Sequence, residues 1–359
     1  MENVRKLKFD RGDPITLFLI EKMHFTPFTF ATVWTVIVVV LGVLAAFISG
    51  SLFSSPSRTG LVNDWVWLIW SLLFTPVIAG YYLWSSTVIE GIIHGLEQSE
   101  ILKVLDEDLN TVAGYFKRPW RKILSLGVMV TVGILYFVTR EKLSGFAASS
   151  VVAKLETSIV YAVLSYFLVM LISKLVINYW AIRRVVLGKK LNINPHHPDN
   201  CGGLRVLSDY SLKVAYLNAV FGILVSVTAY RLYIIGYIWA SVVAVLFYLG
   251  VAMVSFFAPL STAHAEMNDA KSKLLLKLGK QFWQDYLAAH DSIGGDSDAL
   301  KNELAKIKQL QELYDLTRGF PVWPFDTTTL RRFFITITSP LIPPLVGLLV
   351  EIIAGLLRS

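Results

Sequence analysis

The stretch HHPDNCGGL, from His196 to Leu204, brings two histidines, an aspartate and the only cysteine of the chain together beside two glycines. Imidazole, carboxylate and thiolate groups are all zinc ligands. A histidine close to an aspartate also suits acid–base catalysis, and glycine amides at the start of a helix can bind an anion. The residues of this candidate loop are His196, His197, Asp199, Cys201, Gly202 and Gly203.

The same residue types make a well-formed turn. Pro195 and Pro198 fix φ at its start. Asp199 is of a type that closes turns through its side chain, and Gly202 and Gly203 permit left-handed backbone. A structural zinc site usually needs a second pair of Cys or His ligands, and the sequence offers none. We therefore predict a structural turn with Gly202 or Gly203 at positive φ, and we expect no metal and no cofactor. A ligand-binding or gating loop is the alternative.

A second set of residues follows one face of the last apolar segment. Thr336, Pro340, Pro343, Gly347 and Glu351 are spaced four, three, four and four residues apart, which places them on one side of a helix. Each proline removes a backbone donor and frees a carbonyl one turn earlier. Small residues, freed carbonyls and one carboxylate suit a water-filled cation path, although the same face would also suit packing within one subunit. The candidate pore-lining residues are Thr336, Ser339, Pro340, Pro343, Gly347 and Glu351.

The composition places both sets of residues in a membrane protein. Of 359 residues, 55% are hydrophobic and only 16% are charged, against about 25% charged residues in soluble domains. The mean hydropathy is +0.58. A net charge of +7 fits positively charged cytoplasmic loops, so we expect the lipid bilayer as a partner and no nucleic acid. The single cysteine excludes an internal disulfide.

Seven segments are long and apolar enough to span a bilayer, which predicts an all-α bundle of seven transmembrane helices. An alternative count of six would merge or demote one weak segment. The third segment is the shortest and is expected to include Trp120–Ile123. The seven segments are Phe28–Gly50, Trp65–Val88, Leu124–Val138, Ser158–Trp180, Val214–Tyr230, Tyr237–Phe257 and Phe333–Leu357.

The positive charges alternate between the two sides of this arrangement. With the N-terminus in the cytoplasm, 26 of the 33 Lys and Arg residues fall on the cytoplasmic side and six on the other. This asymmetry predicts an N-in, C-out orientation, and we expect the protein in the plasma (inner) membrane. Lys174 lies within the fourth segment, and we expect it to reach the inner interface or to pair inside the bundle.

The chain divides into four predicted regions. Residues 1–27 form a cytoplasmic tail, 28–262 a six-helix transmembrane region, 263–332 a cytoplasmic helical subdomain and 333–359 the last transmembrane helix. In the subdomain, apolar residues at helical spacing predict two amphipathic helices on either side of Asp291–Asp298. The loop after the second segment carries another helix-like stretch, Ile92–Leu109.

Two motifs resemble those of a known family. HPDNCGGL resembles the HPDxxGGL signature of an uncharacterised family of bacterial polytopic membrane proteins, and PVWPFDTTTL, from Pro321 to Leu330, resembles its VPFDxxTL-like segment. The resemblance spans about His196 to Leu357, includes SPLIPPLVGLL, and implies a coherent fold but no activity. The predicted topology is also similar to that of insect-chemoreceptor-type tetrameric ion channels, by analogy alone.

These patterns favour an oligomeric, cation-conducting ion channel, with a tetramer favoured and the last helix lining the pore. A single-subunit transporter of a small solute is the first alternative. A membrane enzyme or effector that uses His197 and Asp199 is the second, although the sequence contains no catalytic signature that would make it an enzyme.

The topology gives the first testable prediction. A reporter that is active only in the cytoplasm should be active when fused after Gly295 and silent when fused after Ser359, because the two positions flank the last predicted crossing. Reporter activity in cells measures this directly. The reverse pattern would rule out seven crossings with the N-terminus inside.

Overall fold

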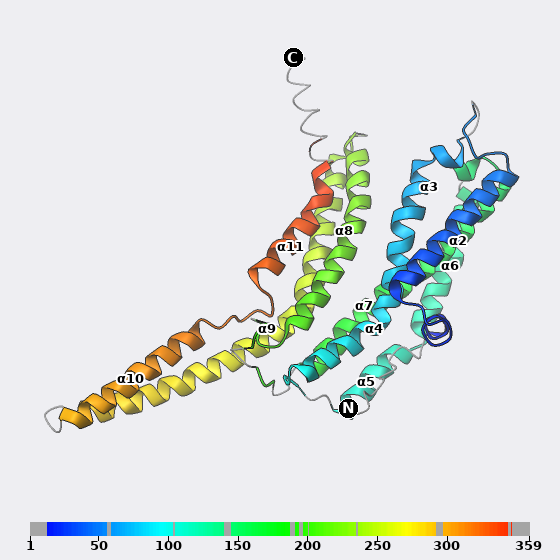
Figure 1. Cartoon of the computed structure of the whole chain (residues 1–359). Coiled ribbons are helices and arrows are strands. Elements are labelled where there is room, and N and C mark those ends of the chain that lie inside the picture. Colours follow the sequence, from blue (N-terminus) through cyan, green and yellow to red (C-terminus); the bar gives the residue numbers. More distant parts are fainter. Residues whose placement is uncertain are drawn as a thin grey trace, which may run out of the picture. The chain divides into compact units, whose positions relative to one another are not determined.

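The structure is a computed structural model that describes residues 13–55, 59–102, 105–139, 145–186, 191–193, 197–199, 201–234, 236–291, 297–343 and 346. Within these residues the chain is helical and has no β-strand (Figure 1). The prediction of an all-α fold is therefore confirmed.

Six helical stretches are long and apolar enough to cross a membrane, as in an integral membrane protein. The second stretch joins α3 (Trp65–Ile69), the π-helical turn η3 (Trp70–Phe74) and α4 (Thr75–Gln98). The third joins α5 (Asp106–Lys117) and α6 (Trp120–Thr139), so it includes Trp120–Ile123 as predicted. The other four are α2 (Pro27–Ile48), α7 (Val151–Val186), α8 (Arg205–Ile234) and α9 (Ile238–Asp291). The seventh crossing and the orientation remain predictions.

Local sequence signals set several helix ends. Thr26 and Thr29 form a reciprocal capping box at the start of α2, and Pro27 occupies the first turn. At α3, the Asp64 carboxylate accepts the N–H groups of Val66 and Trp67, both at 3.1 Å. These side chains satisfy donors that have no partner within a helix.

The prediction of a helix-like stretch over Ile92–Leu109 is wrong for the middle of that range. α4 ends at Gln98 and α5 begins at Asp106. Between them Glu100 adopts a φ of +54°, and the carbonyl of Ile101 accepts the N–H of Asn192 at 2.8 Å. The Ile101 side chain is buried. A tertiary contact and an apolar anchor therefore outweigh the local helical preference.

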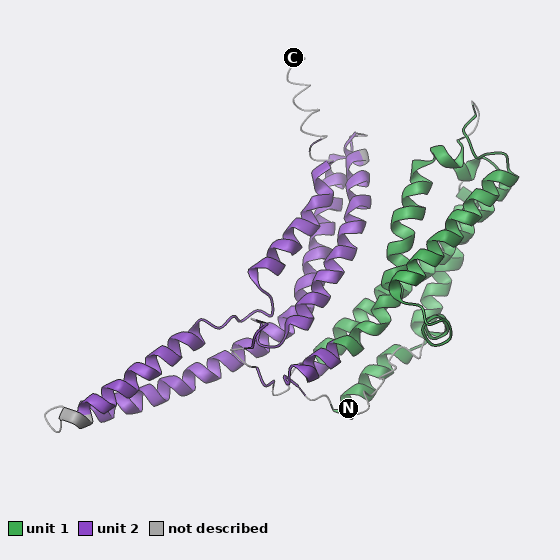
Figure 2. Ribbon diagram, in the orientation of Figure 1, with its two compact units in different colours: residues 1–91, 105–184 green, residues 92–104, 185–359 purple. Residues whose placement is uncertain are grey.

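The chain folds into two compact units (Figure 2). Unit 1 comprises residues 1–91 and 105–184, and it contains α1 (Pro14–Leu17), the π turn η1 (Phe18–Lys22), α2, α3, α5, α6 and most of α4 and α7. Unit 2 comprises residues 92–104 and 185–359, and it contains α8, α9, α10 (Ser297–Arg318), α11 (Thr327–Thr338) and the 3₁₀ turn η6 (Ser339–Leu341).

Aromatic rings form part of the core of unit 1. The ring of Phe167 on α7 lies 5.8 Å from that of Phe30, 5.3 Å from that of Trp34 and 4.8 Å from that of Tyr82. Edge-to-face and tilted contacts of this kind suit the charge distribution of aromatic rings. They join α2, α4 and α7 around the ring of Phe167.

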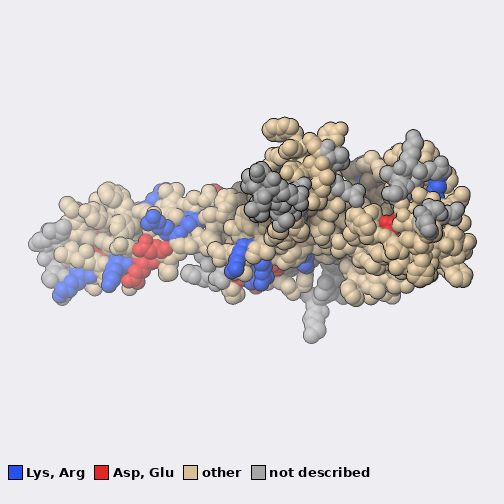
Figure 3. Space-filling model, turned by 90° about the horizontal axis from the view of Figure 1, so that it is seen from above, with Lys and Arg blue, Asp and Glu red and all other residues tan. Residues whose placement is uncertain are grey.

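In unit 2, α9 continues for 54 residues and packs along α10. The two helices predicted in 263–332 are thus the last part of α9 and α10, and the first is continuous with a membrane-length helix. Lys271 closes the pair by donating to the carbonyls of Arg318 and Phe320 at 2.7 and 2.8 Å. In Figure 3 charged side chains gather over this hairpin, which we call the α9–α10 hairpin, whereas most of the other described surface seen there is uncharged.

Candidate functional site

The loop that contains His197, Asp199 and Cys201 is a turn organised by one carboxylate. Asp199 Oδ1 accepts the N–H groups of Cys201 at 2.8 Å and Gly203 at 3.0 Å, and Oδ2 accepts that of Arg205, at the start of α8, at 3.3 Å. Gly202 and Gly203 have φ values of +66° and +90°. The predicted left-handed glycines are therefore confirmed. His196 lies outside the described residues.

The electrostatics of this loop do not favour chemistry at the thiol. Burial and the Asp199 carboxylate raise the pKa of Cys201 to about 12, so the group stays a neutral thiol near pH 7. Burial also opposes ionisation of Asp199, but the N–H groups of Cys201 and Gly203 outweigh it and lower the pKa of that carboxyl. His197 Nδ1 lies 2.8 Å from Asp199 Oδ1. The carboxylate is thus engaged in holding the turn.

The predicted pore-lining residues that the structure describes differ in their exposure. Thr336 and Pro340 are half-buried, whereas Ser339 and Pro343 are exposed. Gly347 and Glu351 lie outside the described residues. The N-cap expected from the sequence is present, because Asp326 accepts the N–H of Thr329 at 2.7 Å at the start of α11. The face that packs inward carries Phe333, Ile337 and Leu341.

Hydroxyl groups satisfy the backbone where the last helix breaks. The Ser226 hydroxyl donates to the carbonyl of Pro340 at 2.6 Å, and that of Tyr248 donates to the carbonyl of Ile337 at 3.1 Å. The Ser339 hydroxyl donates to the carbonyl of Thr336 at 3.1 Å. Two of the carbonyls expected to be freed by proline, those of Thr336 and Pro340, therefore have partners inside unit 2.

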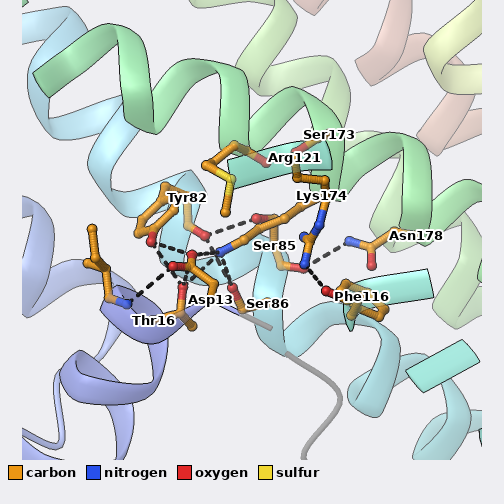
Figure 4. A network of polar contacts seen from close by, with 12 residues as sticks. Asp13, Thr16, Tyr82, Ser85, Ser86, Phe116, Arg121, Ser173, Lys174 and Asn178 are labelled. Carbon is orange, nitrogen blue, oxygen red and sulfur yellow. Dashed lines mark hydrogen bonds and ion pairs between the residues drawn. The ribbon is translucent and has the colours of Figure 1, made fainter. Parts of the chain in front are cut away.

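The most unusual group of charges lies in unit 1, where Asp13 and Lys174 form a fully buried ion pair (Figure 4). Lys174 Nζ is 3.1 Å from Asp13 Oδ2, and both side chains are 0% exposed. Lys174 lies on α7, a membrane-length helix, and Asp13 immediately precedes α1. A buried charge is expensive without a counter-charge, so the two groups must be considered together.

Hydroxyl groups complete the surroundings of the pair (Figure 4). Tyr82 and Thr16 donate to Asp13 Oδ2 at 2.5 and 2.7 Å. Lys174 donates to the hydroxyls of Thr16 and Ser86, both at 2.8 Å, and its ammonium lies 3.9 Å from the centre of the Tyr82 ring. Both charges thus have polar partners, which a stable buried pair needs. We call Tyr82, Ser86 and Lys174 the lysine pocket.

The residues of this cluster come from three elements, and local contacts position each element. Asp13 caps α1 by accepting the N–H of Ile15 at 3.2 Å. On α4, Tyr82 and Ser86 are four residues apart and share a face. On α7, Asn178 follows Lys174 by one turn and donates to the carbonyl of Ser85 at 2.9 Å. These contacts fix α4 beside α7 around the charges.

The electrostatics of the pair favour its ionised form. Burial opposes ionisation of Asp13, but Lys174 and the hydrogen bonds from Tyr82 and Thr16 outweigh it, so the pKa of the carboxyl lies below its usual value. Pairing within the bundle, one of the two outcomes expected for Lys174, is what the structure shows. The role of Asp13 was not predicted, and the only local signal was the Asp-Pro start of a helix.

Comparisons with protein-family models, with curated proteins and with solved structures find no match for this chain.

The turn gives the second prediction. Gly203→Val should lower the folded yield and the melting temperature, because a Cβ at this position would lie 2.3 Å from the Ile101 side chain and a branched residue disfavours a φ of +90°. His196→Ala should leave both quantities nearly unchanged. Thermal unfolding of the purified variants measures the difference. Stoichiometric zinc in metal-analysed protein, lost on His197→Ala, would contradict a structural turn.

Proposed function

We propose that the protein is a transporter that moves a small solute or ion through a single subunit. The observation that carries this proposal is the Asp13–Lys174 pair, which is fully buried beside two membrane-length helical stretches. Ionisable groups inside membrane bundles are costly, and they characteristically mark paths for substrates, ions or protons. A purely structural contact between α4 and α7 could be made by apolar side chains at lower cost.

The packing of the last helix supports the same proposal. The carbonyls of Ile337 and Pro340 are bound by hydroxyls of α9 and α8 in the same unit. Gly222 makes this approach possible, because a Cβ there would lie 2.5 Å from the Tyr248 hydroxyl and 3.1 Å from Pro340 Cγ. Packing of this helix against α8 and α9 of the same chain is the arrangement expected when the path lies within one subunit.

The third prediction tests transport in proteoliposomes loaded with radioactive sodium, rubidium, chloride or acetate. The wild type should release at least one tracer with saturable kinetics. Lys174→Met should slow that release about tenfold or more, since it leaves the Asp13 carboxylate buried without its counter-charge. Lys154→Met, the same substitution on the same helix at a half-buried position, is the matched control and should retain most of the rate. No protein-dependent release of any tracer would contradict the proposal.

A second candidate function is the cation-selective homo-oligomeric channel, with a tetramer favoured. Its specific support is the exposed side of the last described segment, where Thr338 at the end of α11, Ser339 in η6 and Pro343 just after η6 are exposed in the single chain. In an oligomer that face would meet copies of itself or water. Glu351, on the predicted continuation of the same helix, would then supply a ring of carboxylates.

The fourth prediction applies to this channel. Two carboxylates about 8 Å apart interact by roughly 2 kcal/mol at an effective dielectric constant of 20, so a ring of them should attract cations and repel anions. Glu351→Gln should lower the cation-to-anion permeability ratio, and Glu351→Lys should lower it further. Reversal potentials in planar bilayers measure this ratio. Monomeric particles in nanodiscs, or ratios that do not change, would exclude the channel.

A further inference from the structure

The N-terminal segment from Asp13 to Lys22 is anchored at the lysine pocket by the polar side chains of Asp13 and Thr16, but it buries little apolar surface. Within α1 and η1, Leu19 is the one hydrophobic side chain that is buried. Ile15 and Phe18 are 38% and 51% exposed. The residue that leads from this segment towards α2, His24, has a φ of +51°, which is strained for a residue with a side chain. Local opening of such a segment costs far less than global unfolding.

Lys174 sets the condition for any such opening. Its ammonium is fully buried and lies 3.1 Å from Asp13 Oδ2. Removing one partner from a buried ion pair is strongly destabilising. Another anion that takes the place of the Asp13 carboxylate removes this cost of releasing the segment.

The groups around Asp13 Oδ2 indicate which chemical class of anion can replace the carboxylate. Tyr82 donates to this oxygen and Lys174 lies within ion-pair distance of it. Ser86, bound to Lys174 at 2.8 Å, lies at the same ammonium, and the Tyr82 ring covers one side of that cation at 3.9 Å. A carboxylate on a short side group meets these donors, because Asp13 already presents one.

We propose that the lysine pocket is a binding site for small carboxylates and that Asp13 is its tethered occupant. A free carboxylate and Asp13 compete for Lys174 and Tyr82, and binding of the free ligand releases the N-terminal segment. The inference names the substrate class of the proposed transporter. The inference rests on the proposed transport function only where movement of the ligand is concerned. Binding of the ligand is tested by a separate experiment.

The fifth prediction is tested by equilibrium binding of radioactive acetate to detergent-purified protein. Asp13→Ala should bind acetate about tenfold or more tightly than the wild type, because a tethered competitor acts at a local concentration of millimolar or higher. The double variant Asp13→Ala with Lys174→Met should lose this binding. It also removes both charges, so it avoids an unpaired buried ion. Acetate should raise the melting temperature of Asp13→Ala, whereas the same concentration of chloride should raise it less.

Asp13→Asn is the second variant in case Asp13→Ala does not fold, because asparagine keeps the cap of α1 and removes the charge. The absence of acetate binding in both variants, or binding that persists without Lys174, would overturn the inference. Acetate binding without flux of any tracer would reject the transporter and leave the pocket. Flux of another tracer without acetate binding would reject only the carboxylate site.

Discussion

The need to neutralise Lys174 is the constraint on which the structure of unit 1 depends. An ammonium group that is 0% exposed on a membrane-length helix cannot be left without a counter-charge. The chain meets this need with Asp13, a residue that precedes the first membrane-length helix. Three elements are drawn together as a result: the α1 segment carries the carboxylate, α4 provides Tyr82 and Ser86, and α7 carries the lysine. The aromatic contacts of Phe167 on α7 then add α2, through Phe30, to the packing around Tyr82.

Unit 2 solves a related problem with neutral groups. The last described helix ends in a 3₁₀ turn at Ser339–Leu341, where proline prevents regular backbone bonding. The hydroxyls of Ser226 and Tyr248 donate hydrogen bonds to the carbonyls of Pro340 and Ile337 and so satisfy these backbone groups. The close approach depends on the absence of a side chain at Gly222. Packing and hydrogen bonding therefore hold α8, α9 and α11 together without any ionised group among these contacts.

The sequence predicted those features that have a local cause. Apolar length predicted seven spanning segments, six of which are membrane-length helices in the described residues, Asp326 predicted the cap of α11, and the Pro, Asp and Gly residues near Asp199 predicted the turn. The Asp13–Lys174 pair could not be predicted in this way, because its members lie far apart in the chain. Its neighbour Thr16 is 158 residues from Lys174 in the sequence. The break at Glu100 was missed for the same reason, since the bond between Ile101 and Asn192 is a tertiary contact.

The magnitudes indicate which of the two polar clusters can control a change of state. A hydroxyl bonded to a carbonyl contributes about 1 kcal/mol net, so losing the bonds at Pro340 or Ile337 would shift a two-state equilibrium only modestly. Breaking a buried ion pair costs about 3–5 kcal/mol, and reversing an equilibrium from 1:99 to 99:1 takes about 5.5 kcal/mol. Under the carboxylate-binding proposal, the incoming anion restores the ion-pair energy that is lost when Asp13 leaves, so it offsets the largest electrostatic cost of releasing the N-terminal segment. That segment buries Leu19 but leaves Ile15 and Phe18 exposed. On this proposal the charged cluster in unit 1 couples ligand binding to motion, whereas the hydroxyl contacts of unit 2 are each too weak to do so.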